Sequence, residues 1–136
     1  MRFISQISKA NIFIKILSIT KIPLMFFCRP KIIHIDDNSV TVRIKLNRRT
    51  KNHVNSMYIG ALVVGADLAG GYLALHYSKQ SKNKISLIFK DFHAEFLKRP
   101  EGDVYFKCEE GLEIKKLINK VNSTSTRQSM PVNVLA

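Results

Sequence analysis

The chain has 136 residues, of which 46% are hydrophobic and 24% are charged, so it is not a disordered chain and forms one domain, residues 1–136, with its own core. Its 22 Lys and Arg residues outnumber its 10 Asp and Glu residues, which gives a formal net charge of +12, mostly before residue 57. A basic surface of this kind suits nucleic acid, an anionic membrane or a phosphorylated ligand, or is simply solvated.

Two local features narrow the class of protein further. The densest basic cluster is Arg48-Arg49-Thr50-Lys51, and it lacks the interleaved aromatic residues on which single-stranded nucleic acid stacks. We therefore expect no nucleic-acid partner. Cys28 and Cys108 have neither CxxC spacing nor a nearby His cluster, so they predict buried, reduced thiols in a cytoplasmic protein. The sequence indicates no metal site and no cofactor.

Residues 3–27 form the first predicted element, an amphipathic helix with an apolar stripe. The stripe comprises Phe3, Ile4, Ile7, Ile14, Leu17 and Ile19. Pro23 should end or kink the helix. Lysines interrupt the apolar run, so it does not read as a signal peptide. A basic helix can lie on a membrane surface, but we expect this one to pack across the sheet and do not expect membrane association.

A β-hairpin follows the N-terminal helix. Residues 31–35 predict a short strand, and Asp36-Asp37-Asn38-Ser39 is a typical turn sequence. Residues 40–46 then alternate strictly between apolar and polar. Val40, Val42, Ile44 and Leu46 share one face. This pattern predicts a second strand with one buried face.

The central helix, predicted over residues 56–77, carries the most informative residue of the chain. Asn55 or Ser56 is a suitable N-cap, and the glycines and alanines that follow allow the helix to lie close against a curved sheet. Asp67 stands in the middle of this apolar helix, where an unpaired carboxylate costs several kcal/mol or becomes protonated. The helix has the length of a membrane span, but a charge at its midpoint is expensive there. We therefore expect a soluble protein in which Asp67 has a function.

The rest of the chain is rich in predicted strands. Residues 85–97 form a long β-rich run whose apolar positions change phase near Asp91, which predicts a bulge or bend. A turn at 99–102 leads into a strand over 103–108, and residues 112–121 predict a short helix. Residues 131–135 begin a final strand. This order of elements predicts an α+β fold in which an antiparallel sheet packs on one long helix.

The sequence from Asn52 to Asp67 resembles the signature of the hotdog fold, and in particular of its acyl-CoA thioesterases. That family has an Asn, then a His-Gly-Gly-Ala or similar turn, then an acid seven residues past the second glycine. Asn52, Tyr58-Ile59-Gly60-Ala61 and Asp67 occupy these positions here, with Tyr and Ile in place of His and Gly. Residues 94–104 also resemble the strand–turn–strand that follows. The resemblance covers residues 20–135 and is nearest to the branch labelled a domain of unknown function.

The resemblance implies a curved antiparallel sheet wrapped around one long helix, with an extra N-terminal helix. The core would span residues 31–136 and lack the usual last strand. It also implies a homodimer, or a tetramer built from it. Asp67 lies about 10 Å along the helix from Gly60, since an α-helix rises ~1.5 Å per residue. In the related enzymes the acid of one subunit faces the helix-start amides of the other.

The resemblance assigns the catalytic roles to three residues. Asp67 would activate water or attack the thioester directly. The unpaired backbone amides near Gly60 would polarise the carbonyl of an acyl-CoA-type substrate. Asn52 would orient the water or brace the loop. A structural role for Asp67 remains open beside the catalytic one.

The residues around the start of the helix would contact the substrate. Those assigned to this role are Asn55, Tyr58 and Ile59. Phe89, Phe92 and Phe96 are candidates for the lining of an acyl tunnel, but ordinary core positions are the simpler expectation. The alternative to an enzyme is a non-catalytic hotdog module that binds an acyl ligand or a protein partner.

Overall fold

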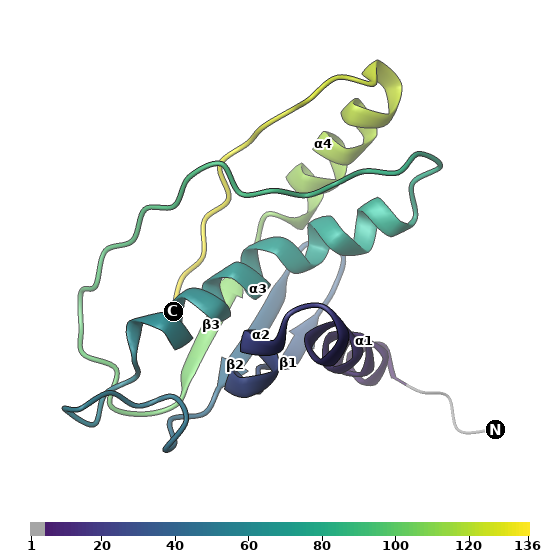
Figure 1. The fold of residues 1–136 in the computed structure, drawn as a ribbon. Coiled ribbons are helices and arrows are strands. Elements are labelled where there is room, and N and C mark those ends of the chain that lie inside the picture. The colour runs from purple at the N-terminus through teal and green to yellow at the C-terminus, as the bar shows by residue number, and fades with distance from the viewer. Residues whose placement is uncertain (1–4) are drawn as a thin grey trace.

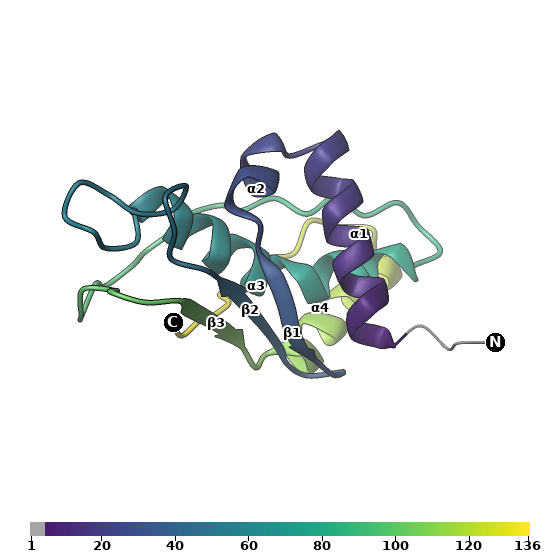
Figure 2. The same ribbon diagram turned by 90° about the horizontal axis from the view of Figure 1, so that it is seen from below.

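The computed structural model describes residues 5–136 and has the α+β architecture that the order of elements predicts. A three-stranded antiparallel sheet, in the order β1-β2-β3, lies against the long helix α3 (Figure 1). The elements are α1 (Gln6–Thr20), α2 (Pro23–Cys28), β1 (Lys31–Ile35), β2 (Val40–Ile44), α3 (Ile59–Lys79), β3 (Val104–Cys108) and α4 (Gly111–Thr124). Helices α1 and α2 lie on the β1 side of the molecule, and α4 packs on α3 (Figure 2).

The β1–β2 hairpin confirms the prediction of two strands joined by a short turn. The inward-facing positions of β2 are Val40, Val42 and Ile44, and the strand ends two residues earlier than predicted. The carboxylate of Asp36 closes the turn, since it accepts the backbone N–H of Asn38 at 2.8 Å and that of Ser39 at 2.6 Å. These hydrogen bonds hold the pKa of Asp36 well below its usual range.

The predicted N-terminal helix is in fact two helices, because Pro23 interrupts it. The Oγ of Ser5 accepts the N–H of Ser8 at 3.1 Å and caps α1, and Pro23 then begins α2. The predicted stripe is wrong for Ile7 and Ile19, which are exposed. The buried face of α1 instead comprises Ala10, Ile14 and Ser18. Phe3 and Ile4 lie outside the described residues.

Asn11 attaches α1 to the edge of the sheet. Its Nδ2 donates to the carbonyl of Ile32 in β1 at 2.8 Å, and its Oδ1 accepts the Ile32 N–H at 2.9 Å. The amide of one side chain thus takes the hydrogen-bonding place of a neighbouring strand. As a result, α1 covers the outer edge of β1.

Helix α3 begins later than predicted, and its cap is different. It starts at Ile59, after Tyr58 as N-cap, and no side chain caps it. Asn55 has a φ of 61° and belongs to a turn, while Ser56 is buried in the same loop. The prediction of Asn55 or Ser56 as the N-cap is therefore wrong, because the loop has to fold back before the helix can begin.

Helix α3 forms the centre of the core. Gly65 faces Phe106 of β3 so closely that a Cβ at that position would lie 2.5 Å from two of the ring carbons. Of the helices in residues 5–136, α3 alone has the length and apolar composition of a membrane span, but more than half of that stretch is buried inside the protein. Its hydrophobicity is explained by its contacts with the sheet and with α4.

The segment 85–97 is not a strand, which corrects the prediction of a long β-rich run with a bulge. It runs as an extended chain past α3 (Figure 1), and within residues 5–136 its backbone makes no hydrogen bond. The side chains of Phe89, Phe92 and Phe96 are 56%, 60% and 60% exposed, so the expectation of core positions is also wrong. An alternating apolar pattern needs a neighbouring strand, and residues 5–136 supply none at that place.

The last part of the chain follows the prediction more closely. Strand β3 and helix α4 form as expected, and α4 extends beyond the predicted residues 112–121. The predicted strand at 131–135 is reduced to one bridge, in which Leu135 and Lys107 exchange two backbone hydrogen bonds of 2.7 Å and 3.0 Å. Both cysteines are buried, free thiols, as predicted.

Candidate active site

Asp67 lies at the wall of a cavity between α3 and the N-terminal helices. The cavity has a volume of about 160 Å³ and is mostly apolar. Its other lining residues are Leu17, Ile22, Met25, Leu68, Gly71, Tyr72, Leu75, Leu87 and Phe89. The residues from α1, α2 and the link between them were not predicted to take part, since their apolar pattern looks like that of any packed helix.

The carboxylate of Asp67 has no partner in the described part of the chain. No hydrogen bond or ion pair reaches it from residues 5–136, and the side chain is half-buried. Burial raises the pKa of Asp67, because the apolar surroundings disfavour the charged form. A carboxylate whose pKa is raised in this way is a candidate for exchanging a proton with a ligand.

Gly71 gives the cavity its depth. It lies one helical turn after Asp67, and a Cβ there would be 3.3 Å from the Phe89 ring and 3.6 Å from Leu87. Without that Cβ, the segment 85–97 can approach α3 and form one wall of the cavity. The helix spacing therefore places the acid beside a surface that accepts apolar groups.

The start of α3 presents the second half of the candidate site. Within residues 5–136, the backbone N–H groups of Ile59 and Gly60 have no acceptor, as expected for the first residues of a helix. Tyr58 and Ile59 are exposed, and the Tyr58 ring lies beside Gly60, where it would be 2.8 Å from an added Cβ. Two unpaired donors at a helix N-terminus favour a negatively charged oxygen.

Asn52 organises the loop before the helix. Its Oδ1 accepts the N–H of Val54 at 3.0 Å and that of Ser56 at 3.1 Å. Its backbone N–H donates to the carbonyl of Ser56 at 2.7 Å. Of the two roles predicted for Asn52, the geometry corresponds to bracing the loop. Asn55 forms the exposed tip of this loop.

The predicted site residues therefore fall into two groups on one helix. Asn52, Asn55, Tyr58, Ile59 and Gly60 come together at its start. Asp67 lies two turns further along the same face, about 10 Å from Gly60 by the rise of ~1.5 Å per residue. The two groups do not meet within one chain.

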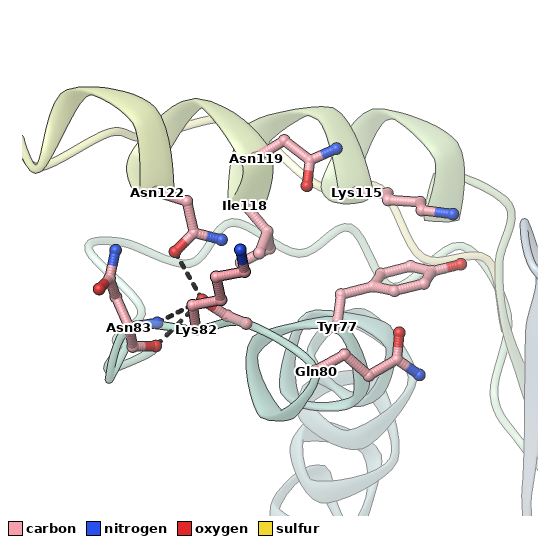
Figure 3. Close-up of a pocket in the computed structure, with 9 residues that line it drawn as sticks. Tyr77, Gln80, Lys82, Asn83, Lys115, Ile118, Asn119 and Asn122 are labelled. Atoms are coloured by element: carbon pink, nitrogen blue, oxygen red, sulfur yellow. Dashed lines mark hydrogen bonds between the residues drawn. The ribbon is translucent and has the colours of Figure 1, made fainter.

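A larger cavity lies at the opposite end of α3 (Figure 3). It has a volume of about 360 Å³ between the end of α3, the following loop and α4. Its polar groups are partly used by the protein itself, since the Ser81 hydroxyl lies 2.5 Å from Oδ1 of Asn122 and accepts the N–H of Asn83 at 3.2 Å. Asp67 does not line this cavity. The hydrogen bond between Ser81 and Asn122 holds the loop on α4. No cluster of metal-binding side chains occurs among the residues described.

Comparison with known proteins gives a family match for the chain and solved structures of similar fold. The family described as "Domain of unknown function (DUF4442)" matches residues 10–136, and no curated protein matches the chain. The fold is similar to that of a protein of unknown function from Chlorobaculum tepidum, with a TM-score of 0.73 and 12% identity over 87% of this chain and 73% of that one.

Two further solved structures have a similar fold. One is a "putative thioesterase" from Shewanella oneidensis, with a TM-score of 0.66 and 15% identity over 74% of each chain. The other, from Pseudomonas aeruginosa, is named a "probable thioesterase", with a TM-score of 0.61 and 22% identity over 83% of this chain and 74% of that one. Together with the family match, these likenesses confirm the predicted hotdog resemblance.

Proposed function

We propose that this chain, which belongs to the DUF4442 family, is a thioesterase that hydrolyses acyl-CoA or related acyl thioesters. The observation that carries the proposal is Asp67, an unpaired carboxylate at the wall of an apolar cavity, on the helix whose first amides are free. The names of two proteins of similar fold support the same class of reaction.

In the proposed reaction, Asp67 removes a proton from water as the water oxygen attacks the thioester carbonyl carbon, or Asp67 attacks that carbon itself. The amides of Ile59 and Gly60 donate to the carbonyl oxygen as it gains negative charge. The C–S bond then breaks, and the thiolate leaves. In the first route the thiolate takes up the proton that Asp67 removed from water. In the second route it takes up a proton from solvent, and water then hydrolyses the anhydride between the acyl group and Asp67, which releases the acid and restores the carboxylate. One such amide typically contributes ~3 kcal/mol to stabilisation of the transition state.

The two halves of the site come from different subunits in this proposal. A separation of about 10 Å along one helix is too long for both groups to contact one carbonyl. The segment 85–97 offers a surface for a second copy, since its backbone is unpaired within residues 5–136 and it exposes three phenylalanines. Strand pairing between two copies would satisfy that backbone and bury those rings. Activity would then require the dimer, or a tetramer built from it.

The basic loop before α3 is suited to the phosphates of CoA. Arg48, Arg49 and Lys51 are exposed and lie next in sequence to the loop that Asn52 braces. Arg99 is less available, because its guanidinium is paired with Glu101. Cations at this position would attract a polyanionic substrate to the helix start.

The first test measures turnover of a panel of acyl-CoAs by the wild type and by Asp67→Asn. Because the amide cannot accept a proton from water, kcat should fall by about 10²–10⁴, the usual contribution of a general base. Glu113→Gln, which removes an exposed carboxylate of α4 outside the site and outside the segment 85–97, is the control and should keep wild-type turnover. A folded Asp67→Asn protein with wild-type kcat would overturn the proposal.

A second test asks whether the site is shared between subunits. Asp67→Asn and Gly60→Val, each inactive as a pure protein, are unfolded and refolded together as a mixture. A shared site predicts that half of the dimers are mixed and contain one intact site each, which restores about a quarter of wild-type activity. A site within one chain predicts no recovery, because each subunit then carries one defect.

The position of Tyr58 favours a second candidate function. Its ring lies beside Gly60, next to the amides that a thioester oxygen has to reach. A non-catalytic module that binds an acyl ligand through the same cavity fits this arrangement. Saturable binding of an acyl-CoA without turnover by the wild type, unchanged in Tyr58→Ala, would favour this function, whereas turnover that depends on Asp67 would exclude it.

A further inference from the structure

Helix α1 is apolar on both of its faces, and only one of them is covered. Ala10, Ile14 and Ser18 face the protein and are buried. On the opposite face, Ile12, Ile16 and Ile19 are 51%, 57% and 54% exposed. Their spacing of four and three residues places them within about 60° of one another on an α-helix. The sequence pattern of α1 predicts packing on the sheet rather than membrane binding. In the structure, only the face with Ala10, Ile14 and Ser18 packs in this way.

The residues after α1 also expose apolar side chains. The link and α2 add four exposed side chains, namely Ile22, Leu24, Phe26 and Phe27. We call these residues, together with Ile12, Ile16 and Ile19, the N-terminal apolar surface. So many exposed apolar side chains within one segment are uncommon on monomers unless a partner covers them.

The charges around this surface identify the partner. On the α1 helical wheel, Lys9 and Lys15 flank the row of isoleucines, one on each side, and both are exposed. Lys21 and Arg29 follow in the same segment, and the sequence has no Asp or Glu before Asp36. Exposed apolar side chains in a segment whose charged residues are all cations are typical of segments that lie in the interface of an anionic membrane.

A second copy of the chain fits this surface less well. A symmetric contact would bring each patch against its own equivalent, so the lysines of the two copies would meet without a neutralising acid. The segment 85–97 already offers exposed apolar side chains for that purpose, at Phe89, Phe92 and Phe96, and it carries charges of both signs.

We propose that the N-terminal apolar surface docks the protein on membranes that contain anionic lipids. Ile22 belongs to this surface and also lines the cavity of Asp67, together with Leu17 and Met25. Docking would thus place the cavity next to the membrane, whose lipids carry acyl chains. This delivery role rests on the proposed thioesterase function, whereas the docking itself does not depend on it.

The test is flotation of the purified full chain with phosphatidylcholine vesicles that contain or lack roughly 30% phosphatidylglycerol, an anionic lipid. We expect binding to the anionic vesicles that weakens as salt is raised. The triple variant Ile12→Ser, Ile16→Ser, Ile19→Ser should lower the partition coefficient at least tenfold. Leu112→Ser, which changes an exposed apolar residue of α4, is the control and should bind like wild type.

A series of lysine variants separates electrostatic binding to anionic membranes from non-specific hydrophobic adsorption. Each lysine near an anionic surface contributes about fivefold to partitioning, from ~1 kcal/mol per charge. Lys9→Gln with Lys15→Gln should therefore reduce binding about 25-fold, whereas Lys116→Gln with Lys120→Gln on α4 should change it little. Circular dichroism establishes that each variant is folded.

Three outcomes overturn the docking proposal. They are no flotation of the wild type, binding that is unchanged in the triple variant, and a triple variant that instead shifts the oligomeric state in gel filtration. Hydrolysis of a short-chain, water-soluble acyl-CoA is measured in parallel. A wild type that hydrolyses this substrate but does not float refutes only the membrane surface, and flotation by an inactive wild type refutes only the thioesterase.

Discussion

Gly65→Ala should destabilise the protein, although alanine is the better helix former. A Cβ at position 65 would lie nearest to Cε2 of Phe106 and 2.5 Å from Cδ2 and Cζ, whereas ordinary contacts begin near 3.4 Å, so the ring would have to move by more than about 0.9 Å. Phe106 is among the largest fully buried side chains, and a packed core does not allow such a shift without strain.

The two opposing effects can be estimated. Overpacking a core typically costs ~1–3 kcal/mol, and replacing a helical glycine by alanine returns up to ~1 kcal/mol. The overlap with three ring carbons places the cost in the upper part of that range, ~2–3 kcal/mol. The net loss should then be ~1–2 kcal/mol, which lowers Tm by roughly 3–8 °C for a domain of this size. Thermal unfolding and urea unfolding, both followed by circular dichroism, measure the two quantities.

Gly70→Ala is the matched control on the same helix. A Cβ there would lie 3.4 Å from Val134 and 3.7 Å from Val132, which are ordinary contacts. This variant should keep most of the helical gain and be up to ~1 kcal/mol more stable than wild type. The reasoning is refuted if Gly65→Ala is as stable as Gly70→Ala, or if Phe106→Leu does not reduce the penalty of Gly65→Ala.

The remaining predictions concern single polar side chains. Tyr77→Phe removes a 2.5 Å hydrogen bond from the phenol to the carbonyl of Asp37 and should cost ~1 kcal/mol in urea unfolding, whereas Tyr105→Phe, at an exposed position, should be neutral. The pKa of Asp36 is lower in the folded state than in the unfolded state. The contribution of Asp36 to the free energy of unfolding is therefore present above its unfolded-state pKa, near 3.8, and is lost as the pH falls through the folded-state pKa. Asp36→Asn should therefore lower Tm at pH 7, and the difference from wild type should shrink in acid, which a pH series of melts measures. The effect of Asp67 on stability depends on pH in the opposite direction. Because the pKa of Asp67 is raised in the folded state, its contribution to the free energy of unfolding is fully present below pH 3.8 and is lost as the pH rises through the folded-state pKa. Asp67→Asn should thus melt at or above the wild-type Tm at pH 7 while it loses turnover, and a clearly lower Tm would contradict an unpaired carboxylate.

Much of the fold was predictable because it is encoded locally. The alternation in residues 40–46 and the turn chemistry of Asp36 define the hairpin without any tertiary information. The segment 85–97 could not be predicted in the same way. Its apolar alternation is real, but a strand exists only where another strand accepts its hydrogen bonds, and that depends on which chain lies beside it.

The candidate site shows a similar division. Asp67 is conspicuous in the sequence because its neighbours on the helix are apolar, and the helix start is recognisable from Gly60. The cavity walls that Leu17 and Met25 provide are not recognisable, since nothing in an amphipathic helix says which partner it meets. The bracing role of Asn52 likewise depends on the path of the loop that its own hydrogen bonds create.

The side-chain amide of Asn11 has a consequence for how the protein avoids uncontrolled aggregation. It occupies the outward-facing N–H and C=O of Ile32 in β1, and the Leu135 bridge does the same for Lys107 in β3. Both outer edges of the sheet are thus closed at one point to strands from other molecules, which limits the edge-to-edge growth that leads to fibres. Replacing Asn11 by an apolar residue would reopen one edge, so a short amide near the beginning of the chain helps to keep assembly finite.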